Sequence, residues 1–461
     1  MIQAGDEDHA NQARNWGRAG IARRNQRLSM MGFRDETGSW YGLDNAAVIM
    51  PAVTSAVSTY LFRLSATIDE PIHLPSLQAA LERVARRFSY FSVELRSGFF
   101  WHYLEPHEAM PRVEADARSP CQDFDMHKRG SLLFRVRARE RTIACEFAHI
   151  LTDGTGGLRF LKNLLAEYFR LRGTEAGPDP DLLDLDAEPA PEEYEDAYNR
   201  YFPEHYPHPD YERPAYHIAS PSLPRGSYRV ITGELPLAEA LAKAKELGVT
   251  LTELLTAAYI EAVQAIWLEE KTRERAVRRH RIAIEVPVNM RKFLATKSNK
   301  NFSLFVHPEQ DMRLGPREFS GILSRVHHYL RYEIDGPSMA RHISRNVSGG
   351  RMLAIRVIPL VLKSPLMRFL YAYYGDNKVS GVLSNLGSVS MPGPLAARIE
   401  RFDFIHAPSP VLKVKVSVLS WRDSLYISFG SLATSRELER LFLTRLRRLG
   451  LPVKVECNLE E

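Results

Sequence analysis

Cysteine is scarce in this chain: Cys121, Cys145 and Cys457 are the only three among 461 residues. They are odd in number and widely spaced, and none belongs to a Cys-x-x-Cys pair. The sequence therefore predicts neither a disulfide framework nor a zinc site, and no other metal site is expected. This use of cysteine fits a reducing, cytoplasmic location.

Long apolar runs are also absent. A membrane-spanning helix needs about 18 uninterrupted apolar residues, and the most apolar stretch, residues 352–374, is interrupted by Arg356, Lys363 and Arg368. We therefore expect no integral membrane association. The stretch is interpreted as a lipophilic amphipathic segment, with a core helix as the alternative. The first residues are polar and acidic and do not resemble a secretory signal.

No single charge dominates the chain, but its two halves differ. Residues 1–214 contain 25 Lys and Arg against 33 Asp and Glu, a balance of −8, whereas residues 215–461 contain 36 against 23, a balance of +13. The second half is the expected host of an anionic ligand, with a solvated basic face as the alternative. Its basic residues are spread out and accompany no nucleic-acid-binding motif, so we expect no nucleic acid partner.

The composition that remains is that of a folded globular protein. Hydrophobic residues make up 44% of the chain and charged residues 25%, and 461 residues exceed what one hydrophobic core usually holds. We predict a polar arm over residues 1–40, an N-terminal domain over 41–175, an acidic, proline-rich linker over 176–214 and a C-terminal domain over 215–461.

Both predicted domains contain strands and helices in a similar order. In the first, alternation and helical spacing predict strands and helices, in chain order, at 59–67, 76–85, 91–95, 99–104, 132–138, 142–149 and 157–171. In the second, they predict them at 227–232, 237–247, 250–267, 281–287, 412–419, 424–430 and 435–450. The order indicates two similar α+β halves.

One short motif follows a predicted strand and precedes a predicted helix. It reads His149-Ile150-Leu151-Thr152-Asp153-Gly154, and the chain then turns through Thr155-Gly156-Gly157. A histidine at a strand end is held by rigid backbone and can still face a cleft. An aspartate four residues later can fix the turn without competing as a base.

The imidazole of His149 suits an acyl transfer reaction. A hydroxyl or amine that attacks a thioester loses its proton as the bond forms, and an imidazole can accept that proton, which contributes roughly 10²–10⁴ in rate. The alternative is a histidine that only caps or packs. Because His-x-x-x-Asp-Gly has only three fixed positions and the chain contains 15 histidines, chance alone could supply such a match.

The strand, the motif, the small residues and the helix together resemble the HxxxDG site of the chloramphenicol acetyltransferase-like superfamily, which includes wax ester synthases and peptide condensation domains. Residues 285–291 (Glu-Val-Pro-Val-Asn-Met-Arg) resemble its strand-and-arginine segment. Residues 384–389 resemble the NxG segment of the alcohol O-acetyltransferase and polyketide-associated branches. The DFGWG segment of plant BAHD enzymes is missing.

The resemblance implies an α+β fold with two similar chloramphenicol acetyltransferase-like α/β sandwich domains and an active site in a tunnel between them. It also implies roles for five residues. His149 is the general base, and Asp153 is a structural partner that pairs with Arg291, unless that pair is only a surface contact. Gly154 is the position where a bulky side chain would crowd substrate and backbone, unless it is an ordinary turn glycine. Asn385 either donates a hydrogen bond near the reacting centre or holds the loop that crosses between domains.

The first functional hypothesis is an acyltransferase that moves an acyl group from acyl-CoA to a hydroxyl. Acyl-CoA is then a co-substrate and no cofactor is permanently bound, with the donor phosphates near the basic half. The acceptor is an alcohol or amine, and a lipophilic one would suit residues 352–374. The alternatives are a condensation-type enzyme that takes its acyl group from an acyl carrier protein to form an amide or ester, and a non-catalytic binding module of the same fold.

Overall fold

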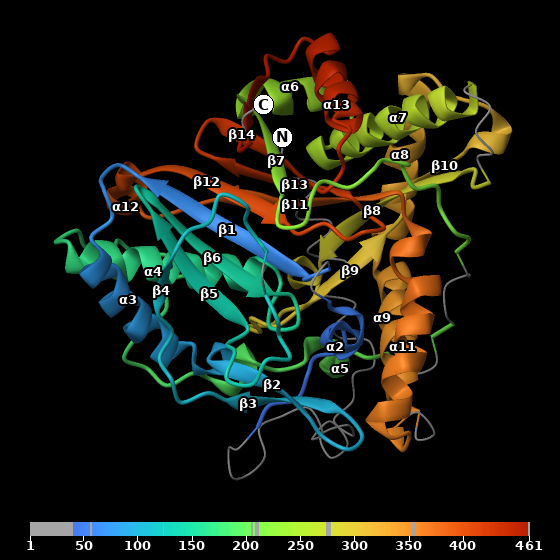
Figure 1. Ribbon diagram of the computed structural model, residues 1–461. Coiled ribbons are helices and arrows are strands. Elements are labelled where there is room, and N and C mark those ends of the chain that lie inside the picture. Colours follow the sequence, from blue (N-terminus) through green and yellow to red (C-terminus); the bar gives the residue numbers. More distant parts are fainter. Residues whose placement is uncertain are drawn as a thin grey trace.

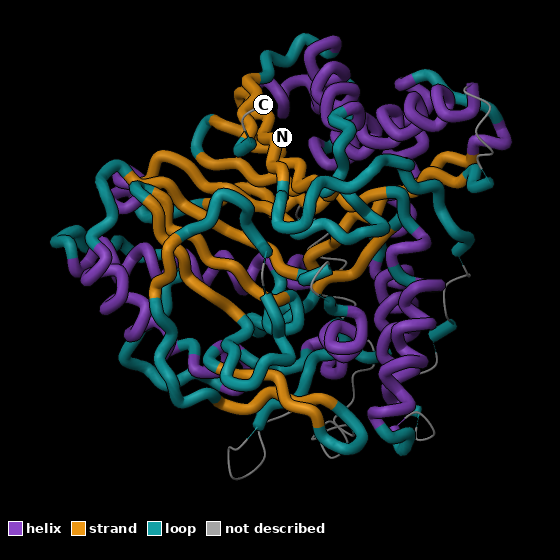
Figure 2. The backbone as a smooth tube through the Cα atoms, in the orientation of Figure 1, coloured by secondary structure: helices purple, strands orange, loops and turns teal. Residues whose placement is uncertain are grey.

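The computed structural model describes residues 40–55, 58–122, 124–203, 206–207, 212–272, 278–352 and 356–459. The predicted arm over residues 1–40 lies outside these ranges except for Trp40. Two mixed β-sheets stand next to each other, and helices pack against both (Figures 1 and 2). The predicted α+β fold class with two domains of this kind is confirmed.

The first sheet has five strands in the order β12-β1-β6-β5-β4. Strand β5 illustrates the alternation that forms this sheet. The side chains of Phe134, Val136 and Ala138 are buried on one face, and the arginines between them point to the other face. The strands are β1 (Leu61–Ile68), β4 (Val113–Ala115), β5 (Phe134–Arg139), β6 (Thr142–Ala148) and β12 (Ile399–His406).

Two helices cover one face of this sheet and pack against each other, namely α3 (Leu74–Arg87) and α4 (Gly154–Leu171) (Figure 1). A two-stranded ribbon of β2 (Val93–Ser97) and β3 (His102–Pro106) lies apart from the sheet. The predicted strand over residues 99–104 is wrong at its start. Gly98 N donates to Trp101 O (2.9 Å), so Phe99 and Phe100 form the hairpin tip.

The second sheet has eight strands in the order β10-β8-β11-β13-β14-β7-β15, with β9 paired to β8. The predicted hairpin is present as β13 and β14. The strands are β7 (Arg229–Pro236), β8 (Arg281–Asn289), β9 (Ser303–Val306), β10 (Glu309–Asp311), β11 (Gly381–Val389), β13 (Val414–Trp421), β14 (Ser424–Ser431) and β15 (Lys454–Cys457).

The second core lies between this sheet and a layer of helices. Helix α7 is at its centre, with thirteen of its 22 residues buried. The helices of this half are α6 (Leu237–Glu246), α7 (Leu251–Thr272), α8 (Phe319–Glu333), α9 (Gly336–Arg351), α11 (Leu360–Tyr374), α12 (Gly393–Arg398) and α13 (Glu437–Arg448). In the described ranges no single helix could cross a bilayer by length and composition; α6 and α7 pass that test only as a pair bent by 83°.

One strand connects the halves in a way that sequence order does not indicate. β12 falls within the range predicted for the second domain, yet it pairs antiparallel with β1, with His406 opposite Phe62. Phe402 and Phe404 are buried in the first core. The first sheet is therefore completed by a strand that comes from the second half of the chain.

The predicted linker folds onto the protein surface. In its described part, residues 176–203, 206–207 and 212–214, it contains a short 3₁₀ helix at Pro191–Glu193 and the helix α5 (Ala197–Arg200). Glu193 forms a buried ion pair with Arg87 of α3, at 2.7 Å. This contact fixes the crossover to the first half.

Candidate active site

A cleft of about 2910 Å³ lies between the two halves. His149, Asp153 and Gly154 line it from the first half, and Asn385 lines it from the second. Ordinary small-molecule pockets measure roughly 300–1,000 Å³, so this cleft has room for two substrates or for one large one.

Asp153 is fully engaged in structural contacts. It caps α4, where its Oδ1 accepts hydrogen bonds from the backbone N–H groups of Thr155 and Gly156, both at 3.2 Å. Its Oδ2 accepts from Arg291 Nη1 (2.7 Å) and from the backbone N–H of Phe302 (3.0 Å). Burial alone would raise the pKa of Asp153, but the Arg291 guanidinium and these donors outweigh it and hold the pKa below its usual value.

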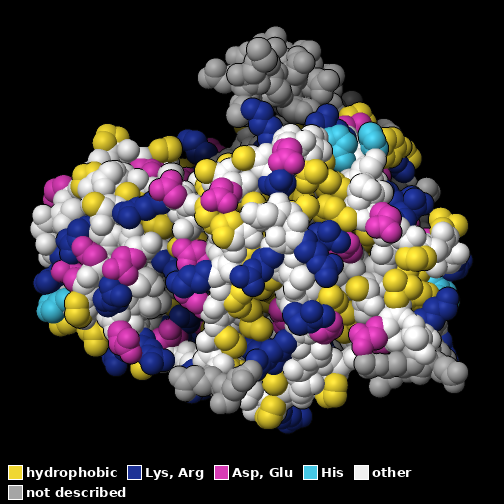
Figure 3. Space-filling view, turned by 90° about the horizontal axis from the view of Figure 1, so that it is seen from above, with side chains coloured by type: hydrophobic (Ala, Val, Ile, Leu, Met, Phe, Trp, Pro, Cys, Tyr) yellow, Lys and Arg dark blue, Asp and Glu magenta, His cyan; other side chains and the backbone are white. Residues whose placement is uncertain are grey.

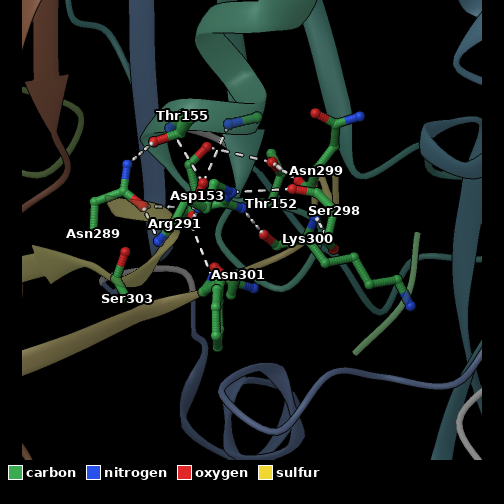
Figure 4. Close-up of polar contacts among 12 residues, drawn as sticks. Thr152, Asp153, Thr155, Asn289, Arg291, Ser298, Asn299, Lys300, Asn301 and Ser303 are labelled. Atoms are coloured by element: carbon green, nitrogen blue, oxygen red, sulfur yellow. Dashed lines mark hydrogen bonds and ion pairs between the residues drawn. The ribbon is translucent and has the colours of Figure 1, made fainter. Parts of the chain in front are cut away.

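Arg291 extends this contact into the second half. Its Nε donates to the carbonyl of Ser298 (3.1 Å), and its Nη2 donates to the carbonyl of Lys300 (Figure 4). The residue lies in the 3₁₀ turn after β8, and only 12% of its side chain is exposed. Asp153 and Arg291 therefore fasten α4 to the segment 298–302 across the domain boundary, and the pair is not a surface contact.

The backbones also approach closely at this junction. Thr152 Oγ1 donates to the carbonyl of Asn299 (2.6 Å). A Cβ on Gly156 would lie 2.2 Å from that same carbonyl oxygen, which explains why the position holds glycine. A Cβ on Gly154 would meet side chains instead, the end of Leu386 at 3.1 Å and the Phe404 ring at 3.5 Å. The backbone crowding expected at Gly154 is thus found two residues later, whereas Gly154 faces the cleft.

His149 directly follows β6, and its backbone N–H donates to the carbonyl of Tyr60 (2.9 Å). Its Nδ1 lies 2.9 Å from Oδ1 of Asn301. The amide orientation of Asn301 is fixed by its Nδ2, which donates to the His149 carbonyl (2.9 Å), a group that can only accept. Asn301 Oδ1 must then accept from Nδ1–H, which leaves Nε2 as the unprotonated nitrogen.

The ring of His149 is suited to stay neutral. Burial lowers its pKa below the usual 6.5, while the Asp153 carboxylate opposes that shift. Behind Asn301 stands Asp44, whose Oδ2 accepts from Asn301 Nδ2 (2.9 Å). Burial raises the pKa of Asp44 to about 7. The described residues offer Nε2 no hydrogen-bond partner, so its lone pair is available to a ligand.

The hydrogen bonds of Asn385 go to residues other than His149. Its Nδ2 donates to Thr252 Oγ1 at the start of α7 (3.0 Å), and its Oδ1 accepts from the backbone N–H of Gly387 (2.9 Å). The pairing of β11 with β13 shifts register after Asn385, and Gly387 has φ +87°. Of the two predicted roles of Asn385, these contacts favour the second, in which it holds the segment that crosses between the domains.

Among the cleft residues that were not identified from the sequence, His406, Lys415 and Tyr60 interact with His149. The rings of His406 and His149 are stacked, with centroids 6.4 Å apart. Burial, His149 and Lys415 keep the pKa of His406 well below its usual value. Tyr60 has φ +49°, an uncommon backbone conformation that aims its carbonyl at His149. These residues carry no motif, because β12 brings His406, β13 brings Lys415 and the start of β1 brings Tyr60 to the site only in the folded chain.

The described ranges contain no group of three or more His, Cys, Asp or Glu side chains that could hold a metal ion. Cationic side chains that line the cleft come mainly from the second half; they are Arg200, Lys292, Arg331, Arg345, Arg351, Arg356, Lys363, Lys378 and Lys415. These are the groups that could meet an anionic ligand.

Comparison with known proteins finds likeness at the level of structure. No known family and no curated protein matches the chain by sequence. Trichothecene 15-O-acetyltransferase from Fusarium sporotrichioides is similar in fold, with a TM-score of 0.56 and 11% identity over 90% of this chain and 95% of that one.

Two further solved structures extend the likeness. Polyketide synthase associated protein 5 from Mycobacterium tuberculosis has a TM-score of 0.54 and 14% identity over 87% of this chain and 97% of its own. The wax ester synthase/diacylglycerol acyltransferase from Marinobacter aquaeolei VT8 has a TM-score of 0.51 and 13% identity over 88% of this chain and 99% of its own. The chain therefore has the fold of chloramphenicol acetyltransferase-like and condensation-domain acyltransferases across its length.

Proposed function

We propose that this protein is an acyltransferase that moves an acyl group from acyl-CoA to a hydroxyl, with His149 as general base. The observation that carries the proposal is the state of the His149 ring. Asn301 holds Nδ1–H, so Nε2 offers its lone pair in a cleft that both halves line. A neutral imidazole with one anchored nitrogen is the form that general-base catalysis requires.

In the proposed reaction the acceptor hydroxyl lies against Nε2. The hydroxyl proton moves to Nε2 as the oxygen attacks the thioester carbonyl, which gives a tetrahedral oxyanion and an imidazolium. The oxyanion then collapses and the C–S bond breaks. The departing thiolate takes the proton from Nε2, so the products are an ester and free coenzyme A, and the ring returns to its starting form.

Two groups could stabilise the charge of the oxyanion. Lys415 lines the cleft, and its charge acts on both histidines, whose pKa values it helps to lower. His406 presents a second imidazole beside that of His149. Donors and cations aimed at a developing oxyanion contribute as much as a base in other acyl-transfer sites. Asp153 has no such part, since all its contacts are to α4, Arg291 and Phe302.

The donor phosphates are assigned to the basic side of the cleft. Eight of the nine cationic residues that line it belong to residues 215–461, the half with a balance of +13. Arg345 of α9 is one of them, and burial lowers its pKa, which indicates a cation held away from bulk water. Such a cation interacts more strongly with a phosphate than a fully solvated one does.

The test is thiol release from acyl-CoA in the presence of hydroxyl acceptors. Purified protein is incubated with acetyl-CoA and with longer acyl-CoAs and a panel of alcohols, and free thiol and ester are both measured. The variant His149→Ala is expected to lose roughly 10²–10⁴ of the rate. Its unfolding midpoint should stay close to that of the wild type.

Controls separate the base from the donor. Wild-type rates in His149→Ala would refute the base assignment. Activity with acyl groups on a carrier protein, and none with acyl-CoA, would mean that the donor is an acyl carrier protein. The assignment of His149 as general base would stand. This second candidate is favoured by the similar fold of the first condensation domain of the CDA synthetase, which has a TM-score of 0.53 and 15% identity over 89% of this chain and 95% of that one.

A further inference from the structure

Helix α11 presents an apolar face to solvent. Its exposed side chains include Val361, Leu362, Leu366 and Phe369, and Val361 is 77% exposed and Phe369 69%. With Pro365, also exposed, these positions fall at the spacing of one helix face. The opposite side of the helix, with Met367 and Leu370, lines the cleft. The core helix offered as the alternative from sequence is therefore wrong: no side chain described in α11 is buried.

The tip of the β2–β3 hairpin extends this apolar face. Leu360 N donates to Phe99 O (2.7 Å), and Lys363 Nζ donates to Phe100 O (2.8 Å), so the tip lies against the first turn of α11 (Figure 1). Phe99 is 70% exposed and Trp101 is 46% exposed. We call Phe99, Trp101, Val361, Leu362, Leu366 and Phe369 the outer apolar surface.

Helix α11, which carries most of the outer apolar surface, is anchored to a neighbouring helix. Arg368 Nε donates to the carbonyl of Ala52 in α2 (Met50–Val53), at 2.6 Å, and α11 packs along α2. The side chains thus stay exposed although the helix itself is fixed. By contrast, the face of the molecule seen in Figure 3 has hydrophobic side chains set among basic and acidic ones. Large exposed apolar patches on soluble domains mark interaction sites.

The charges around this surface indicate the kind of partner. Residues 352–374 contain no acidic residue. Of their three cations, Arg356 and Lys363 line the cleft, whereas Arg368 is exposed beside the outer apolar surface. Aromatic and aliphatic side chains on one face of a helix, with a cation beside them and no carboxylate, are typical of segments that lie in the headgroup region of a bilayer and attract anionic lipids.

We propose that the outer apolar surface docks the protein on an anionic lipid membrane. Phe99 and Trp101 of the hairpin tip and the exposed face of α11 enter the interface together, while Arg368 meets lipid phosphates. The docking is peripheral, because the inserted elements are one hairpin tip and one helix face.

The docked orientation places the cleft next to the lipid. On the inner side of α11 the Tyr371 ring packs against Tyr60, with centroids 6.0 Å apart, and the Tyr60 carbonyl accepts from His149 N. Among the residues that the structure describes, α11 therefore lies between the membrane and the site. If the proposed function holds, on which this step rests, the acceptor class is a long-chain alcohol dissolved in the bilayer.

Vesicle flotation tests the docking. The full-length protein is mixed with vesicles of phosphatidylcholine alone or of phosphatidylcholine with phosphatidylglycerol. Wild type is expected to float with the mixed vesicles and less with the neutral ones. The variant Leu362→Glu/Phe369→Glu, and separately Phe99→Glu, should lower the partition coefficient at least about tenfold, because each places a carboxylate in the interface.

The matched control is Leu314→Glu. Leu314 is 71% exposed and lies in the turn after β10, outside the outer apolar surface, so this variant should float like wild type. Unfolding midpoints should be unchanged in all variants, since the substituted side chains are exposed. Wild type that floats with neither vesicle overturns the proposal. A dimer that Leu362→Glu/Phe369→Glu dissociates, without flotation of wild type, would overturn it in favour of a second copy of this chain.

An activity measurement tests entry of the acceptor from the membrane separately from the acyl transfer itself. Thiol release from acetyl-CoA is followed with 1-hexadecanol in mixed vesicles and with 1-butanol in solution. Leu362→Glu/Phe369→Glu is expected to lose about tenfold or more with hexadecanol and to retain its rate with butanol. If this variant and the wild type react with hexadecanol at equal rates, entry of the acceptor from the membrane is overturned. Absence of thiol release with both alcohols in wild type would refute the proposed function, while the flotation result would stand.

Discussion

The two ends of the segment 149–154 differ in how they use their polar atoms. At one end, Asp153 accepts four hydrogen bonds and forms a buried ion pair, with no acceptor site left over for a ligand. At the other end, His149 has one ring nitrogen fixed by Asn301 and the other without a partner among the described residues. The first end holds two halves of the protein together, and the second is open to the cleft.

This difference predicts different outcomes for substitutions only a few residues apart. Changes at the Asp153 end should appear first as lost stability, and activity should follow because the halves are no longer aligned. Changes near His149 should leave the Asp153–Arg291 pair intact and act mainly on rate or pH dependence. The predictions below test this division.

The largest effect is expected for Asp153→Asn. Asparagine can still cap α4, but the buried Arg291 loses its counter-charge, and breaking such a pair costs about 3–5 kcal/mol. The measurement is the free energy of unfolding from urea titration. The double variant Asp153→Asn/Arg291→Met should lose less than the sum of the two single changes, because it leaves no buried charge unpaired.

The same pair gives a pH dependence. The folded-state pKa of Asp153 lies below its usual value of 3.8. Its contribution to stability is therefore full at pH values above the unfolded pKa and is lost as the pH falls through the folded pKa. Asp153→Asn should remove this acid sensitivity. The surface pair Glu437–Arg440 is the contrast: Glu437→Gln should change the midpoint much less at any pH.

The second prediction concerns the two glycines of the turn. Gly156→Ala should destabilise the protein by about 1–3 kcal/mol or more, because the new methyl group would overlap the Asn299 carbonyl, which Thr152 holds in place. Gly154→Ala is the matched control, since the atoms nearest to its methyl group belong to the side chains of Leu386 and Phe404. Urea midpoints measure both. Equal losses at the two positions would show that backbone approach is not what distinguishes them.

The third prediction concerns the fixed nitrogen of His149. Asn301→Ala removes the acceptor for Nδ1–H, so the ring can adopt the other tautomer and rotate. We expect kcat to fall about tenfold to a hundredfold, which corresponds to the loss of one or two hydrogen bonds. Asn289→Ala, which loses contacts to Thr155 and Arg291 but none to the imidazole, should retain more activity. A kcat for Asn301→Ala equal to that of wild type would contradict the anchoring role.

The sequence predicted those parts of the fold and site that are local. The strand before His149, the helix after Asp153 and the hairpin of β13 and β14 follow from alternation, spacing and capping within a few residues. Arg291 was found because it lies in a segment that resembles a known family. The alternation of β5 likewise reveals which of its side chains are buried.

Long-range contacts explain what the sequence could not reveal. β12 pairs with β1 from more than 300 residues away, and nothing in its own residues specifies the sheet that it joins. His406 and Lys415 reach the cleft only through that pairing and through β13. The apolar stretch that includes α11 is compatible by composition with a core helix, and only the folded chain shows its apolar face directed outward.

The smallest expected effect is at Lys415, and it tests whether the open end of the segment is set for base catalysis. Burial is the main cause of the low pKa of His149, and the Lys415 charge adds to it. Removing that charge in Lys415→Met should raise the pKa of His149 by less than about one unit and move the acid limb of kcat/KM to higher pH. An NMR titration of the His149 ring, assigned by its absence in His149→Ala, measures the shift directly. A lower pKa of His149 in Lys415→Met would mean that the lysine does not act on the ring through its charge. The proposal that Lys415 stabilises the oxyanion would then also be refuted.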